Sequence, residues 1–254
     1  MEADQSRVES RKSRAGTGGS GGESDGFEAK LSTLDSPPST LLAHHFHSLP
    51  QQREAQLAGM WVFLATELLV FGALFTGYTV YRVQYPEAFA AASQHLNLII
   101  GGVNTVVLLT SSLTMVLAVH ATQIGRRRMQ VSCLVVTALL GTAFMALKAV
   151  EYTIDYYDKL VPGLAFEPQE WVQRGVDPRP VKLFFAFYYI MTGLHALHLT
   201  VGIAILGVQA VLAARGRFVP ANYMPVELAG LYWHFVDVIW IFLLPLLYLI
   251  GVRG

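Results

Sequence analysis

The chain has 254 residues, of which 53% are hydrophobic, and its formal net charge is zero with a single cysteine, Cys133. A zero net charge argues against a strongly basic nucleic-acid binder, and one cysteine cannot close an intrachain disulfide. The sequence has no CxxCH element, paired-cysteine site or glycine-rich phosphate loop, so covalent haem, a thiolate metal centre and a nucleotide site have no sequence support. The composition predicts a polytopic membrane protein with a soluble tail.

Residues 1–56 are polar and rich in serine, glycine and charge, so we expect a disordered N-terminal tail. This segment also has no hydrophobic region typical of a secretory signal. Near its end, His44, His45 and His47 precede the first hydrophobic run. They fit either a solvated segment at the membrane surface or a group that collects protons or binds a metal.

Five apolar runs follow the tail, each long enough to cross a bilayer as a helix. They predict an all-α fold, a bundle of five transmembrane helices within residues 57–254. The fourth run is too long for an upright span, so we expect it to tilt or to project from the bilayer. The predicted spans are residues 57–81, 98–120, 129–152, 182–213 and 226–251.

Basic residues in the short loops predict the orientation of the chain. With five crossings, the arginines at 126–128 and at 215 and 217 lie on the same side as the tail, and a basic side is typically cytoplasmic. The N-terminus is therefore predicted inside and the C-terminus outside. The long outer loop at 153–181 mixes acids, aromatics and prolines, and fits either an irregular cover for the bundle or a contact surface for a partner.

Several ionisable residues lie inside the predicted spans. A rise of 1.5 Å per residue places Glu67 roughly 15 Å from the cytoplasmic end of its span, and His234 and Asp237 roughly 12 and 16 Å from theirs. We therefore expect these three groups to occupy one layer. His234 and Asp237 also share a helix face with Trp233.

Two further pairs sit three residues apart, which places each pair on one helix face. His195 and His198 lie about mid-span, and Lys148 and Glu151 lie near the outer end of the third run, where an ion pair is a sufficient explanation. A metal site is not expected, because two histidines on one face leave the coordination of haem iron or copper incomplete.

Three interpretations fit these intramembrane groups. They form a hydrogen-bonded network that fixes helix packing. Alternatively, Glu67 with His234 and Asp237 forms a proton or ion path. The third interpretation is binding of lipid headgroups, helped by tryptophans and tyrosines at the span ends.

Several motifs resemble subunit III of the haem–copper oxidases. The stretch Tyr232–Trp240, preceded by Glu227, closely resembles that subunit's last transmembrane helix, and Thr192–Gly202 resembles its penultimate one. Lys148–Tyr152 is similar to a further family element, and Glu67 falls where the family keeps a membrane-embedded carboxylate. The similarity covers about residues 56–251 and lacks the first two helices of full-length members. It thus resembles the five-helix form found in quinol oxidases, some bacterial cytochrome c oxidases and accessory proteins of nitric oxide reductases.

The resemblance implies a non-catalytic subunit with no cofactor of its own, docked on a catalytic subunit I that carries haem and copper, reduces oxygen and pumps protons in the aerobic respiratory chain. Such a subunit stabilises the complex, holds phospholipid and supports proton uptake, here in a bacterial cell (inner) membrane. Glu67 would be the embedded carboxylate. The interior polar network or lipid contacts would comprise Glu151, His195, His198, Glu227, Trp233, His234 and Asp237.

Three other functions fit the same residues. One is the accessory subunit of a nitric oxide reductase, which neighbouring genes would distinguish. Another is a proton-coupled transporter that uses Glu67, His234 and Asp237, although five helices do not split into the equal inverted halves usual in transporters. The third is a membrane scaffold whose buried polar groups only specify packing.

Overall fold

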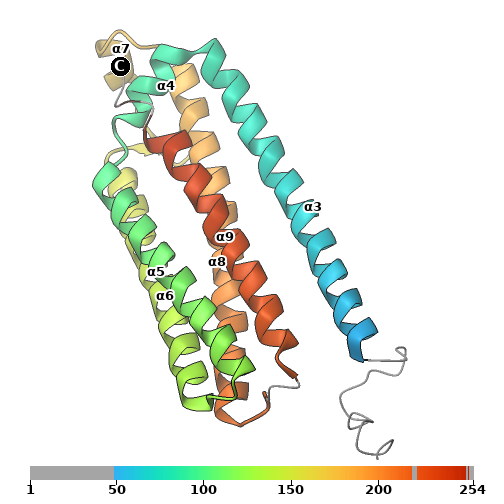
Figure 1. The fold of residues 1–254 in the computed structure, drawn as a ribbon. Coiled ribbons are helices and arrows are strands. Elements are labelled where there is room, and N and C mark those ends of the chain that lie inside the picture. Colours follow the sequence, from blue (N-terminus) through green and yellow to red (C-terminus); the bar gives the residue numbers. More distant parts are fainter. Residues whose placement is uncertain (1–48, 219–221, 250, 252–254) are drawn as a thin grey trace, which may run out of the picture. The chain divides into compact units, whose positions relative to one another are not determined.

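Five long helices make up most of the part of the chain that the structure describes. The computed structural model describes residues 49–218, 222–249 and 251, and Figure 1 shows their arrangement. Each long helix contains a stretch long and apolar enough to cross a membrane, which confirms the prediction of an all-α membrane protein with five spans. The helices are α3 (Leu49–Gln84), α5 (Leu98–Gln123), α6 (Arg127–Tyr157), α8 (Pro178–Ala214) and α9 (Met224–Tyr248). His44, His45, His47 and most of the predicted tail lie outside the described residues.

Most helix ends differ from those that hydropathy predicts, although α5 begins at Leu98 as predicted. Helix α3 starts at Leu49 where the prediction places residue 57, because polar residues with good helix propensity follow Pro50 at its start. Helix α6 likewise continues to Tyr157 beyond the predicted end at 152. The apolar runs therefore mark the stretches that suit a membrane, and helices such as α3 and α6 extend past them.

The loop between α6 and α8 has secondary structure of its own. Strand β1 (Leu160–Val161) pairs with β2 (Ala165–Phe166) in antiparallel register, and helix α7 (Pro168–Gln173) follows. The turn between the strands contains Gly163, whose φ of +84° lies in the region that favours glycine. The only large side chain that α7 buries is Trp171, whose ring lies 6.3 Å from the ring of Phe185 on α8. The loop is thus fastened to the end of the bundle.

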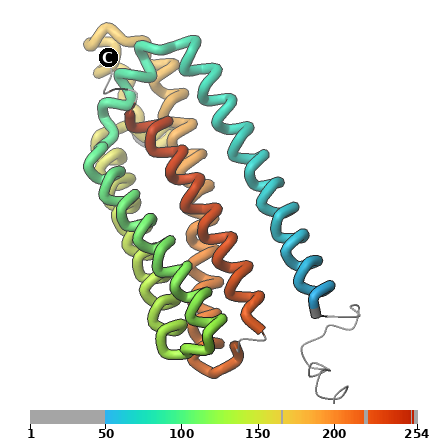
Figure 2. Tube along the Cα trace, viewed as in Figure 1, coloured from blue at the N-terminus to red at the C-terminus, as the bar shows by residue number. Residues whose placement is uncertain are grey.

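Helix α9 is the central helix of the unit formed by Gln56–Gly254. It packs between α5 and α8, with α6 behind, and α3 stands at one side of this group (Figures 1 and 2). Half of the residues in the apolar stretch of α9 are buried, against 11% of those in α3. A polar residue on α9 therefore faces protein more often than one on α3.

Two glycines let the Trp233 indole of α9 approach its neighbours. A Cβ at Gly141 on α6 would lie 2.6 Å from the Trp233 Cη2 atom, and a Cβ at Gly202 on α8 would lie 3.1 Å from the same ring. Close approach of helix backbones at small residues is usual in membranes, where packing rather than hydrophobic burial holds helices together. The indole Nε1 donates to the Ser111 hydroxyl of α5 at 3.1 Å, so Trp233 joins all three neighbouring helices.

The end of α9 lies close to the turn after α3. Because α9 ends at Tyr248, its last carbonyls have no helical donor, and two of them accept side-chain hydrogen bonds. Tyr78 of α3 donates to the Leu246 oxygen at 2.8 Å, and Ser93 of α4 (Pro86–Ser93) donates to the Leu247 oxygen at 2.7 Å. Backbone groups at membrane depth need such partners, so these bonds fasten α3 and α4 to the core.

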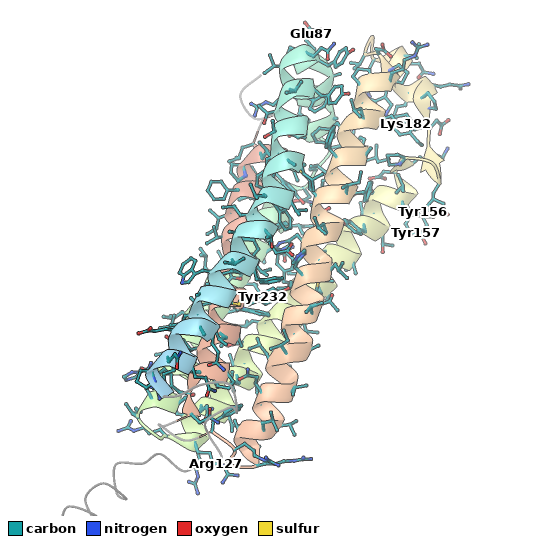
Figure 3. All side chains as sticks on the ribbon, turned by 90° about the vertical axis from the view of Figure 1, so that its right-hand side faces the viewer. Glu87, Arg127, Tyr156, Tyr157, Lys182 and Tyr232 are labelled. Carbon is teal, nitrogen blue, oxygen red and sulfur yellow. The ribbon has the colours of Figure 1, made fainter. Side chains whose placement is uncertain are left out.

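The two ends of the unit carry different residues (Figure 3). Glu87 and Lys182 lie at one end, Arg127 lies at the other, and Tyr232 lies between them. The Arg127 guanidinium donates to the carbonyls of Ala213 and Ala214, which closes the C-terminus of α8. Arg127 therefore joins the two short loops that are predicted to be cytoplasmic.

Candidate functional site

The carboxylate of Glu67 meets the imidazole of His198 where α3 faces α8. The Glu67 Oε2 atom lies 3.0 Å from the His198 Nε2 atom. The side chains are 22% and 13% exposed, so the pair is neither fully buried nor free in solvent. Among the described residues, neither His234 nor Asp237 hydrogen-bonds to Glu67. The similar depth predicted for these three residues therefore does not bring them into direct contact.

The other imidazole nitrogen defines what this pair can do chemically. His198 Nδ1 lies 2.8 Å from the Leu194 carbonyl oxygen, which can only accept, so Nδ1 carries a hydrogen. Only Nε2 is then left to exchange a proton with Glu67. An imidazolium beside a carboxylate and a neutral imidazole beside a carboxylic acid differ by one proton shift along a single hydrogen bond. One proton is therefore able to shift within the pair without changing its net charge, and the pair releases or takes up a proton only with a change of one unit of charge.

Aromatic side chains fix the position of the His198 ring. The Phe71 ring of α3 lies 5.4 Å from it, and the Tyr232 hydroxyl of α9 donates to the His198 carbonyl at 3.0 Å. Phe63, one turn before Glu67, lies 6.2 Å from the Tyr232 ring. The pair thus sits where α3, α8 and α9 meet, with apolar rings around it.

A groove of about 550 Å³ lies between α3 and α9. Its lining is apolar except for His234. The His234 Nδ1 atom lies 2.7 Å from the Ser112 hydroxyl of α5. The groove walls are formed by Trp61, Leu64, Ala65, Leu68, Phe75, Leu231, His234, Phe235, Val238, Ile239 and Phe242.

Asp237 lies on the face of α9 that packs against the protein. It is 3% exposed, and neither carboxyl oxygen has a hydrogen-bond partner among the described residues. Ser112 is the polar side chain beside it, although not in a geometry that makes a hydrogen bond. The structure therefore brings together Trp233, His234 and Asp237 with two serines of α5 that the sequence analysis did not single out.

Lys148 and Glu151 form a second polar cluster, buried in the bundle near the Tyr157 end of α6. The Lys148 Nζ atom donates to Glu151 Oε2 at 2.9 Å and to the hydroxyls of Tyr188 and Tyr248 at 3.2 and 2.9 Å. The Tyr248 hydroxyl in turn donates to Glu151 Oε1 at 2.5 Å. Every donor direction of the ammonium group is used, which is what a buried charge needs. The sequence indicated the ion pair but not the tyrosines, which lie on other helices and have no spacing signal.

Two of the predicted site residues do not join either group. His195 is fully enclosed between the rings of Phe144 and Trp240, at 5.6 and 5.4 Å, and neither ring nitrogen has a partner among the described residues. Glu227 lies in the first turn of α9, where a negative charge suits the helix dipole. In the described part of the chain, no three side chains of His, Cys, Asp or Glu gather as metal ligands do.

The family model for cytochrome c oxidase subunit III matches residues 38–158 and 181–252, which is most of the chain and all five helices. The chain belongs to the cytochrome c oxidase subunit III family. This confirms the resemblance seen in the sequence motifs. The protein is accordingly a subunit III of a haem–copper terminal oxidase, and not a stand-alone transporter.

Individual relatives agree with this assignment. Cytochrome c oxidase subunit 3 of a Synechocystis strain is 33% identical over 213 residues, covering 82% of this chain and 80% of the relative. Cytochrome c oxidase subunit 3 of Thermostichus vulcanus is 31% identical, covering 86% and 97%. Quinol oxidase subunit 3 of Bacillus spizizenii is 30% identical, covering 78% and 88%. The subunit III family thus includes relatives named for either electron donor.

Proposed function

We propose that this subunit III stabilises the catalytic subunit I of its oxidase and supports proton uptake through the Glu67–His198 pair. The haem and copper that reduce oxygen belong to subunit I. This chain supplies membrane-embedded surface and a proton-holding group. In our proposal it spans a bacterial inner membrane with the N-terminus in the cytoplasm, as the basic loops at 126–128 and 215–217 favour.

The hydrogen bond between Glu67 and His198 carries the proton-uptake part of this proposal. A carboxyl group inside a membrane span is costly unless it is paired, and it marks proton pathways in many membrane proteins. Glu67 is paired through a single bond, and its 22% exposure leaves the carboxylate accessible from outside the core. A group that only fixed helix packing would be expected to make more than one bond and to be buried on all sides.

The groove between α3 and α9 supports a role in lipid binding. It lies within the membrane spans, is lined by apolar side chains and has a tryptophan, Trp61, on its wall. Such a groove suits an acyl chain, and tryptophans are typical of positions near lipid headgroups. Bound phospholipid would fill the space between α3 and the core of the subunit.

Gentle purification of the tagged chain from its native membrane tests the assignment to a complex. We expect a partner that contains haem and copper to copurify and to consume oxygen. A chain that purifies without any haem-containing partner would contradict the proposal. A copurified partner that reduces nitric oxide and not oxygen would instead identify an accessory subunit of a nitric oxide reductase.

A further inference from the structure

His234 presents an accessible polar atom to the apolar groove between α3 and α9. Its Nδ1 atom lies 2.7 Å from the Ser112 hydroxyl, and its ring lines the groove among aliphatic and aromatic side chains. Within residues 49–218 and 222–249, Nε2 has no hydrogen-bond partner, and it is not one of the unpaired polar atoms that the protein encloses completely. A molecule in the groove is therefore able to reach Nε2.

Ser112 determines which ring nitrogen carries the hydrogen. Among the described residues, the Ser112 hydroxyl has no acceptor in hydrogen-bonding geometry other than His234 Nδ1. Its hydrogen is therefore used only if Ser112 donates and Nδ1 accepts, and a neutral imidazole that accepts at Nδ1 carries its own hydrogen at Nε2. The opposite tautomer would leave the hydroxyl hydrogen without an acceptor inside the membrane, which costs free energy. His234 thus offers an N–H donor to the groove.

This donor needs an acceptor that hydrocarbon does not supply. His234 stands near the middle of α9, which runs from Met224 to Tyr248, and Ser112 stands near the middle of α5. Both helices are long enough to cross the hydrocarbon core, so the donor lies far from the two membrane surfaces, where the phosphate and ester oxygens of phospholipids lie. The position selects a molecule that is apolar as a whole and carries an acceptor oxygen into the hydrocarbon.

The shape of the groove suits a flat ring with a long apolar tail. Its volume of about 550 Å³ falls within the ~300–1,000 Å³ typical of small-molecule sites. Phe75 of α3 and Phe235 of α9 both line it, so aromatic rings are available to pack against another ring. Val238 and Phe242 continue the wall beyond His234 at helical spacing, which gives an apolar tail a path along α9. A quinone combines these features, because it has an uncharged ring, carbonyl oxygens and an isoprenoid tail.

We propose that this groove binds an isoprenoid quinone whose ring carbonyl oxygen accepts a hydrogen bond from His234 Nε2. The ring lies at the depth of Ser112, which holds the imidazole, and the isoprenoid tail follows Val238 and Phe242. The proposal rests on the lipid-binding role proposed above for the groove, and it names the class of lipid that the middle of the groove takes. Binding involves no covalent or redox step in this chain, because the ring is held by one hydrogen bond and by apolar contacts.

Photolabelling of the assembled oxidase with a trace of an azido-quinone that carries a short isoprenoid tail tests this site. After illumination, the subunits are separated and the labelled peptides are identified by mass spectrometry, so label on this chain is distinguished from label on any other subunit. We expect label in the segments of α3 and α9 that line the groove, and we expect excess unlabelled quinone to prevent it. A phospholipid with a diazirine on its acyl chain is used in a parallel sample.

The histidine is then varied. His234→Leu removes the donor, so we expect about tenfold more unlabelled quinone to be needed for half-maximal protection, which corresponds to about 1.4 kcal/mol and is the size of one hydrogen bond. His234→Gln keeps an N–H donor near the position of Nε2 and should bind much closer to the wild type. The matched control is His120→Leu, which makes the same change at an exposed histidine of α5 outside the groove and should leave protection unchanged.

Three results would overturn the quinone site: no quinone label on this chain, label only outside the groove, or equal protection curves in His234→Leu and the wild type. The map of label on the wild type decides alone if the His234 variants fail to assemble. Phospholipid label in the groove without quinone label would overturn the quinone and leave the proposed lipid binding standing, whereas neither label there would contradict both. None of these results bears on the Glu67–His198 pair.

Discussion

Two acid–base pairs inside the same bundle differ in how completely they are enclosed. Lys148 and Glu151 are 4% and 3% exposed and share hydrogen bonds with two tyrosines. Glu67 and His198 are 22% and 13% exposed and share one. The first arrangement resembles a folded core in which every polar group is bonded, and the second leaves room for a proton to enter and leave.

This difference in burial indicates that one pair contributes to the stability of the protein and the other to proton exchange. A buried charge that loses its partner destabilises the protein strongly, whereas a partly exposed pair contributes little to stability. The positions of the two pairs support these different roles. Helices α6, α8 and α9 enclose Lys148 and Glu151, whereas Glu67 lies on α3, the least buried of the long helices. We therefore assign a structural role to Lys148 and Glu151 and a proton-holding role to Glu67 and His198.

Removing the buried cation should produce the largest effect. Lys148→Met leaves the Glu151 carboxylate buried without its charge partner, so we expect a loss of about 3–5 kcal/mol in the free energy of unfolding. Denaturant or thermal unfolding of the assembled complex measures it. Lys182→Met is the matched control, because Lys182 is exposed and has no charged partner among the described residues. Equal losses in the two variants would contradict the structural role of Lys148.

Packing around Trp233 offers a second, smaller test of the same contrast. Gly141→Ala places a Cβ 2.6 Å from the Trp233 ring, and overpacking of this kind costs about 1–3 kcal/mol. Gly72→Ala on α3 meets nothing within 4 Å, so we expect no loss and a gain of up to about 1 kcal/mol from helix propensity. Thermal unfolding of both variants checks the prediction. A Gly141 variant as stable as the Gly72 variant would show that the core is looser than the distances indicate.

An exposed ion pair in the loop between α6 and α8 should give the smallest effect. Glu167 beside Lys159 raises the pKa of that ammonium through a hydrogen bond and charge attraction, and both side chains are largely exposed. A raised pKa means that the stabilisation is present at neutral pH and disappears as the pH rises through the folded-state value. Glu167→Gln should therefore lower Tm slightly at pH 7 and coincide with the wild type well above about pH 10.4, the ordinary lysine value. A difference that grew with pH would contradict this assignment.

The sequence predicted the fold better than it predicted the contacts. Apolar runs gave the five spans, because the length of a membrane helix is set by the bilayer, and motif resemblance gave the family. The sequence analysis grouped Glu67 with His234 and Asp237 by depth, whereas the structure bonds Glu67 to His198 and His234 to Ser112. Depth along a span follows from counting residues. Counting residues does not predict which helices are neighbours or which face of each helix turns toward a neighbour, because both depend on how the helices pack.

The missed residues are small or aromatic and carry no charge. Ser111, Ser112, Tyr188 and Tyr248 bond to Trp233, His234, Lys148 and Glu151, but serine and tyrosine are ordinary residues in membrane helices. Only the requirement that a buried polar group finds a partner points to such residues, and it does not say which helix supplies them.

The proton-holding role of Glu67 is tested by replacing Glu67 and Glu151 separately with glutamine in the assembled oxidase. Proton pumping, active life during turnover and the stability of the complex are measured for each variant. We expect Glu67→Gln to leave the unfolding free energy within about 1 kcal/mol of the wild type and to reduce proton uptake or shorten active life. Glu151→Gln should lower stability and leave proton uptake per turnover unchanged. Unchanged pumping and active life in Glu67→Gln would contradict the account and would leave the pair as scaffolding alone.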